Sequence, residues 1–195
     1  MNALGRCSDI LVERGRFRQA ADRQKNLAEI YRDDPNTLDK AFQAYDQAAQ
    51  WYTQEGASAT SSACMREAAQ IAIQLQMYPR AIELWESVAG ISLGSSLTKY
   101  SVKEFYLNAG LCYLAIPDTA AATRALAYYA QQDPGFPTTQ EGQFLHGLLE
   151  ATDHGDIQAF DQRVGEFDRM KPVTGWRATL LHSIRQKVAA EPDLS

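Results

Sequence analysis

The sequence predicts an all-α protein built from antiparallel helical hairpins stacked side by side. Three segments of helical length repeat the same mixture of small and aromatic residues: 16–31, 40–56 and 78–90. Alanine lets neighbouring helix axes approach closely, while tyrosine and tryptophan fill the space between them. These residues are Ala20, Ala28, Ala41, Ala48 and Ala81, with Tyr31, Tyr45, Tyr52, Tyr78 and Trp85. The spacing is typical of two-helix repeats, although a closed helical bundle would show the same periodicity.

Glycine, proline and possible N-cap residues divide the chain into further helical segments. The helices are expected at about 3–14, 17–32, 40–56, 58–76, 78–88, 101–116, 119–129, 139–153, 156–169 and 173–190. Ser58 or Thr60 is expected to cap the fourth helix, and Asp118 or Thr119 the alanine-rich seventh. Residues 89–96, rich in glycine and serine, are expected to form an exposed loop.

Two domains are expected, a solenoid of helical hairpins at 1–137 and a helical cap at 138–195. The proline-rich segment 133–137 makes a stiff break between them, and the helices that follow are shorter and more acidic. Such a cap would cover the apolar end of the repeat array.

Composition indicates an ordinary globular protein, with 45% hydrophobic residues and a net charge of −5. No segment has the roughly 20 apolar residues that span a bilayer, and the N-terminus has no signal-peptide pattern, so a cytoplasmic location is expected. Cys7, Cys64 and Cys112 are odd in number and widely spaced, which favours buried free thiols over disulfides or zinc ligands.

The charges are unevenly distributed along the chain. Residues 1–32 contain seven Arg or Lys against four Asp or Glu, so the excess of acid lies in the rest of the sequence. A basic beginning could meet an acidic partner and an acidic end a basic one, although solvated helix faces would show the same pattern. The sequence is not basic enough to predict nucleic-acid binding.

Motifs for catalysis are absent from the sequence, which contains no Walker loop, dinucleotide fingerprint, zinc-protease motif or nucleophile elbow. His146, His154 and His182 could meet as metal ligands, but their spacing is wrong and no cysteine accompanies them. Glu150 and Asp153 are one turn apart and are expected on the solvated face of a helix. We therefore predict neither an enzyme nor a cofactor.

Several blocks of sequence together resemble one known family. They are Gly15-Arg16-Phe17, Ala28-Glu29-Ile30-Tyr31, Lys40-Ala41 with Tyr45, the stretch 97–103, Leu148-Leu149-Glu150-Ala151, Trp176 and the ending Pro192-Asp193-Leu194-Ser195. With nearly gap-free spacing, this set is similar to the C-terminal two-thirds of the soluble NSF attachment proteins, the alpha-SNAP adaptors of membrane fusion.

The resemblance implies a non-enzymatic adaptor with a right-handed superhelix of TPR-like hairpins. Members of the family wrap a SNARE four-helix bundle and recruit NSF, a hexameric AAA ATPase that pulls the bundle apart during vesicle fusion. The protein would then associate with membranes peripherally, through SNARE complexes. Because the chain opens inside what should be a helix, the membrane-contacting loop of full-length members is expected to be missing, and direct membrane attachment lost.

The resemblance also assigns a SNARE-facing strip. Its residues here are Arg16, Arg23, Leu97, Lys99, Tyr100 and Lys103. The cations would attract an acidic bundle, and Leu97 and Tyr100 would make apolar contacts. Asp22 and Ala63 stand where the family commonly has lysine, and the nearby Arg23 and Arg66 are candidates to substitute.

A second set of residues would bind the ATPase: Glu150, Asp153, Glu191, Asp193 and Leu194. In the family a penultimate leucine is required to stimulate ATP hydrolysis, and Leu194 holds that place; otherwise it belongs to a solvated tail. His154 stands where the family usually has another acid. A generic TPR-like scaffold for other proteins, or a truncated attachment protein acting as a regulator, remain the alternative functions.

Overall fold

The computed structural model describes residue 11 and residues 15–190, and all regular structure in this part of the chain is helical. The predicted all-α class is therefore confirmed. The chain divides into two compact units, one ending at Gly94 and the other starting at Ser95. Several predictions fall outside the described residues: those for Cys7, Glu191, Asp193 and Leu194. The helix predicted at 3–14 also lies outside them, except for Leu11.

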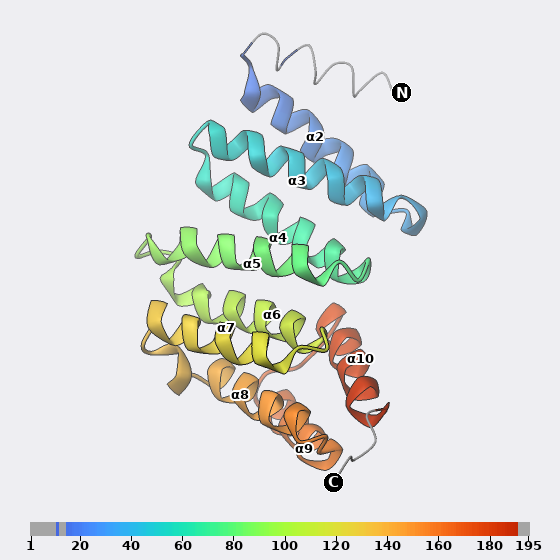
Figure 1. Ribbon diagram of the computed structural model, residues 1–195. Coiled ribbons are helices and arrows are strands. Elements are labelled where there is room, and N and C mark those ends of the chain that lie inside the picture. Colours follow the sequence, from blue (N-terminus) through green and yellow to red (C-terminus); the bar gives the residue numbers. More distant parts are fainter. Residues whose placement is uncertain (1–10, 12–14, 191–195) are drawn as a thin grey trace. The chain divides into compact units, whose positions relative to one another are not determined.

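The first unit is a run of helices in which each packs on the next (Figure 1). Its elements are α2 (Phe17–Arg32), the 3₁₀ turn η1 (Pro35–Thr37), α3 (Leu38–Gln54), α4 (Ser58–Gln74) and α5 (Tyr78–Leu93). The turn between α3 and α4 is closed by Gly56, whose φ of +69° favours glycine. Helical hairpins are thus the building units here, as predicted.

Small residues allow the close packing of the first unit. The five alanines singled out in the sequence, Ala20, Ala28, Ala41, Ala48 and Ala81, are all 0% exposed. Tyr45, Tyr52 and Trp85 are buried in the same unit, whereas Tyr31 and Tyr78 are only half-buried. For the buried side chains the prediction is confirmed that alanines and large aromatic residues together form the buried core of the hairpins.

Two local predictions in this unit are wrong. Neither Ser58 nor Thr60 caps α4, because Ser58 is already its first residue and Ala57 stands at the N-cap without a side-chain bond. The expected loop at 89–96 is helical as far as Leu93. Ala89 and Ser92 are buried, and they continue the stripe of Trp85 and Val88 at helical spacing, which keeps the chain in the helix.

The second unit is arranged around α6 (Val102–Leu114), which contacts α7, α8 and α10 (Figure 1). Its other elements are η2 (Lys99–Ser101), α7 (Thr119–Gln132), η3 (Phe136–Thr138), α8 (Gln140–Asp153), α9 (Ile157–Met170) and α10 (Trp176–Ala190). Helix α10 starts later than predicted, because the Val173 N–H is bound by the Asp168 side chain and Gly175 has a φ of +61°. The boundary expected at 137/138 falls inside this unit and stays a prediction.

Side-chain caps start three helices of the second unit. Asp118 accepts a hydrogen bond from the Ala121 N–H, Thr139 from Gly142 and Asp156 from Ala159. Each bond satisfies a backbone donor that the helix itself leaves free. The prediction of a cap at Asp118 is confirmed.

Two of the three cysteines are described, and both are buried free thiols, as predicted. Burial raises the pKa of Cys64 to about 11, and it also raises the pKa of Cys112. The thiolate form is disfavoured in both cases, so these residues act as small core side chains.

Gly142 allows the start of α8 to lie against the backbone of η3. A Cβ at this position would lie 2.1 Å from the Phe136 carbonyl oxygen. Gly142→Ala should therefore lower the free energy of unfolding by about 1–3 kcal/mol, measured by urea denaturation. Gly165→Ala is the matched control, because nothing lies within 4 Å of its Cβ position in α9. The control should gain up to about 1 kcal/mol from helix propensity; a stabilised Gly142→Ala would contradict the close approach.

Candidate functional site

The loop before α6 presents two large apolar side chains to solvent. Leu97 is 91% exposed and Tyr100 is 84% exposed, the two highest values among the exposed large hydrophobic residues described. The backbone is ordered by turns, since the Lys99 N–H donates to the Ser95 carbonyl and the Ser101 N–H to the Thr98 carbonyl. Exposed apolar side chains on an ordered loop are a typical contact surface for another protein.

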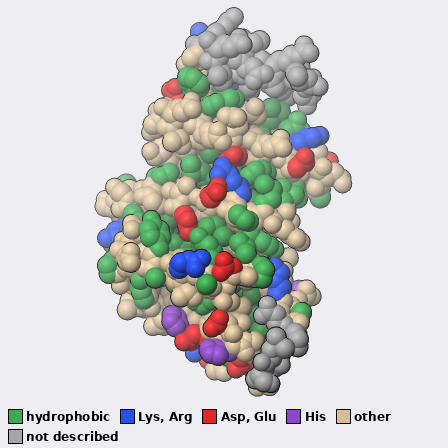
Figure 2. Space-filling view, viewed as in Figure 1, with side chains coloured by type: hydrophobic (Ala, Val, Ile, Leu, Met, Phe, Trp, Pro, Cys, Tyr) green, Lys and Arg blue, Asp and Glu red, His purple; other side chains and the backbone are tan. Residues whose placement is uncertain are grey.

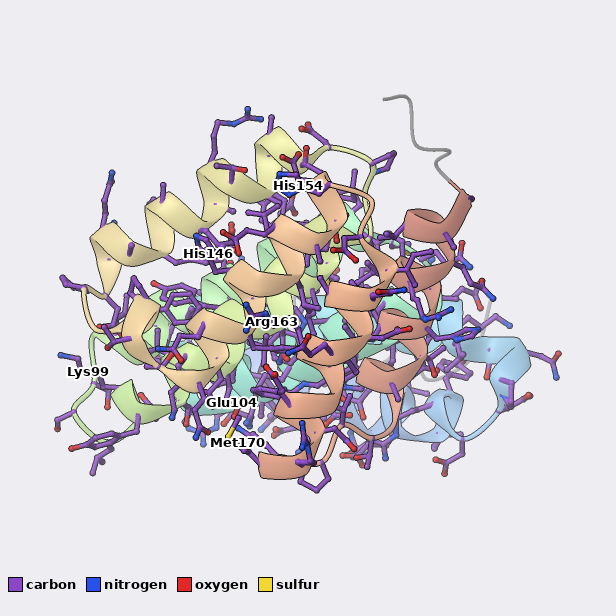
Figure 3. The ribbon with its side chains drawn as sticks, turned by 90° about the horizontal axis from the view of Figure 1, so that it is seen from below. Lys99, Glu104, His146, His154, Arg163 and Met170 are labelled. Carbon is purple, nitrogen blue, oxygen red and sulfur yellow. The ribbon has the colours of Figure 1, made fainter. Side chains whose placement is uncertain are left out.

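Lys99 lies on the same loop and extends away from the helices (Figure 3). It makes no ion pair with any other described side chain. An acidic partner could therefore approach it without displacing an internal contact. The loop thus combines one available cation with two exposed apolar side chains.

Lys103 has a different environment, although the sequence groups it with Lys99. Its ammonium lies 3.3 Å from Oε2 of Glu141, a residue that is only 2% exposed. Among the described residues, Oε2 accepts no hydrogen bond, so this ion pair is its nearest charge compensation. Lys103 therefore already has an internal partner.

Glu141 belongs to a larger charge network within the second unit. Lys171 donates to Oε1 of Glu141 at 3.1 Å and also pairs with Glu104, a residue labelled in Figure 3. Arg177, from α10, donates to Glu104 at 2.7 Å and to the Asn108 side chain at 2.9 Å. Burial, together with the neighbouring Arg177 and Lys103, lowers the pKa of Lys171. The network joins the first turns of α6 and α8 to α10, and sequence reasoning did not find it.

The remaining residues of the predicted SNARE strip lie in the first unit. Arg16 stands at the N-cap of α2, and Arg23 is on the same helix; both are exposed and make no ion pair with another described side chain. Asp22, which replaces a family lysine, accepts a hydrogen bond from the Tyr52 hydroxyl. Burial and this bond raise the pKa of Tyr52. Asp22 therefore fastens α2 to α3.

The two described residues of the predicted ATPase surface are at the C-terminal end of α8. Glu150 and Asp153 are both exposed, as expected. His146 Nδ1 lies 3.5 Å from Oε1 of Glu150, and His154 Nδ1 is 2.8 Å from the Glu150 carbonyl oxygen. Figure 2 shows histidine and acidic side chains gathered together on this face, and Figure 3 labels both histidines.

A groove between α7 and α8 opens beside these acids. It has a volume of about 640 Å³, and Glu150, His146 and Arg163 line it. Its apolar side chains include Leu126, Ala130, Phe136 and Leu149. Arg163 reaches it from α9 across Gly147, where an added Cβ would lie 2.8 Å from the arginine Nε. Sequence reasoning missed this groove; a glycine in the middle of α8 was the available signal.

The described side chains give no sign of catalytic or metal chemistry. No three His, Cys, Asp or Glu residues in this part of the chain group as metal ligands. None of the helices described here is both long enough and apolar enough to cross a bilayer.

Comparison with known proteins identifies a family. The family model described as "Soluble NSF attachment protein, SNAP" matches residues 1–189. Vesicular-fusion protein SEC17 of Coprinopsis cinerea is 41% identical over 195 residues, covering 100% of this chain and 68% of the relative. The alpha-soluble NSF attachment protein of Vitis vinifera is 35% identical over 191 residues, covering 98% and 66%.

The alpha-soluble NSF attachment protein of Saccharomyces cerevisiae is 30% identical over 193 residues, covering 99% of this chain and 66% of the relative. The chain thus spans about two thirds of the length of the curated relatives that it matches. Because the family model covers almost the whole sequence and the relatives align along its full length, the chain belongs to the soluble NSF attachment protein family.

Proposed function

We propose that this protein is a non-enzymatic adaptor that binds SNARE four-helix bundles and recruits and stimulates the ATPase NSF in vesicle fusion. Membership of the attachment-protein family over residues 1–189 is the observation that carries this proposal. The protein would reach membranes peripherally, through its SNARE partners. Residues 1–137 would form the hairpin solenoid and residues 138–195 the cap.

The residues proposed for SNARE binding are Arg16 and Arg23 in the first unit, with Leu97, Lys99, Tyr100 and, at the base of their loop, Lys103 in the second. Exposure supports this proposal, because the large apolar side chains of Leu97 and Tyr100 are almost fully exposed to solvent, as is typical of a protein contact site. The available cations suit an acidic helical bundle, where opposite charge speeds encounter and selects the partner. Apolar contact at the loop would then supply the short-range affinity.

The ATPase-binding surface comprises Glu150, Asp153, Glu191, Asp193 and Leu194. Glu150 and Asp153 occupy the last turn of α8, where the helix dipole is negative and acidic side chains are unfavourable. Helix stability therefore does not explain these two acids. A basic surface on the ATPase would compensate both the side chains and the helix end.

Binding of a SNARE bundle tests the proposed surface directly. Replacing Leu97 and Tyr100 together by serine should weaken binding by about 30-fold or more, because exposed side chains at a contact centre carry most of the affinity. Isothermal calorimetry with a purified four-helix SNARE bundle provides the measurement. Tyr128→Ser is the matched control, since Tyr128 is 49% exposed on α7. If the double variant binds like the unaltered protein, the loop is not the contact site.

Charge reversal at Lys99 tests the electrostatic part of the proposal. Lys99→Glu should weaken bundle binding by roughly tenfold at low salt and much less at about 0.5 M salt, because screening removes the repulsion. Arg124→Glu changes the charge equally on the exposed side of α7 and should have little effect. A loss that is equal at both salt concentrations would show that Lys99 does not act through charge.

Leu194 tests the second surface. Leu194→Ala should abolish stimulation of ATP hydrolysis by NSF while leaving the affinity for the SNARE bundle unchanged, because the two partners use different residues. A coupled ATPase assay and a bundle pull-down measure the two properties on the same preparation. Ser195→Ala serves as the neighbouring control. Unchanged stimulation by Leu194→Ala would refute the assignment.

A further inference from the structure

Lys103 and Lys99 are four residues apart, but only Lys103 forms an ion pair with another described side chain, while 42% of its own side chain stays exposed. Lys99 is exposed and makes no ion pair with another described side chain. The Lys103 ammonium faces the carboxylate of Glu141, whose side chain is 2% exposed. Sequence alone gives the two lysines the same role; their surroundings separate them.

Removing the Lys103 charge would leave the buried carboxylate poorly compensated. Lys171 binds Oε1 of Glu141 but also pairs with Glu104, while Oε2 has no hydrogen-bond donor among the described residues. A buried charge that loses its partner is strongly unfavourable. Moving Lys103 outward to an acidic partner would have the same effect, so this contact opposes binding through Lys103.

The ion pair between Lys103 and Glu141 lies directly after the Leu97–Tyr100 loop, where it can restrain the loop's backbone. Lys103 is the second residue of α6, which follows η2 directly, and Glu141 is the second residue of α8. The next residue, Glu104, pairs with Lys171 and Arg177. The C-terminal end of the loop that presents Leu97, Lys99 and Tyr100 is therefore fastened to α8 and α10 by two successive charged residues.

We propose that Lys103 is a positioning residue, which orders the Leu97–Tyr100 loop by binding buried Glu141 instead of contacting the partner. This inference rests on the proposed SNARE-binding function and refines the role of one residue within it. In this view Leu97, Lys99 and Tyr100 contact the partner, and Lys103 holds the end of their loop against α8. Partner affinity then depends on Lys103 through the order of the loop.

A double-mutant cycle between Lys103 and Glu141 tests this inference on the full chain. The variants are Lys103→Met, Glu141→Gln and the double variant, with Lys99→Met as the matched control. Methionine keeps the length of the side chain without its charge, and glutamine removes the buried charge that Lys103 compensates. Amide hydrogen exchange at residues 99–106 reports the order of the loop, and calorimetry with a SNARE bundle at two salt concentrations reports binding.

Lys103→Met should speed exchange at residues 99–106 by about tenfold and weaken binding by a similar factor at both salt concentrations. The double variant should return exchange and affinity to within about twofold of Glu141→Gln alone. Lys99→Met should leave exchange unchanged and reduce the dependence of binding on salt. Lys103→Arg keeps the cation and should match the unaltered protein in exchange.

The inference is overturned if Lys103→Met leaves exchange unchanged, or if the double variant binds as weakly as Lys103→Met. If Lys103→Met unfolds, recovery of the fold on adding Glu141→Gln supports the inference, and failure to recover refutes it. An unaltered protein that binds no SNARE bundle would refute the proposed function. The exchange measurements would still decide whether Lys103 acts through Glu141.

Discussion

Helix α6 buries ten of its thirteen residues, and α7, α8 and α10 pack against it. The hydrophobic effect drives this arrangement, because a helix that is apolar on almost every side must be covered on almost every side. Such a helix has no free face to offer a partner. Exposed side chains of this unit therefore lie in the loop before α6 and on the helices that cover it, where Leu97, Tyr100 and Glu150 are found.

Several charged side chains of the second unit gather at the first turn of α6, close to the buried Asn108 of the same helix. Lys103 and Glu104 meet Glu141, Lys171 and Arg177 there, and Arg177 also binds Asn108. These contacts satisfy charges that would otherwise be costly in partly buried positions. They also specify the orientation of α8 and α10 relative to α6, because charged pairs are more directional than apolar contacts.

The periodicity of small and aromatic residues predicted the hairpins, because close helix packing needs alanine wherever the axes approach. Local signals were weaker where burial overrides them, as at Ala89 and Ser92, whose glycine-rich surroundings suggested a loop. Family resemblance singled out Leu97, Lys99 and Tyr100 as partner-facing, and all three are exposed. The pairing of Lys103 with Glu141 joins residues 38 positions apart and has no sequence signal, since it depends on how α6 and α8 pack. The groove at Gly147 also depends on helix packing, and the glycine in the middle of α8 was its one signal in the sequence.

Glu150 and Asp153 place negative charge at the end of α8 where positive charge would stabilise the helix. Selection for thermal stability alone would replace Glu150 and Asp153 with lysine or arginine. The same replacement would remove the negative charge from the end of α8. A variant selected for stability alone would thus lose the acidic side chains that the proposed ATPase contact needs. Under the proposed ATPase-binding role, thermal stability and partner binding therefore favour opposite charges at these two positions.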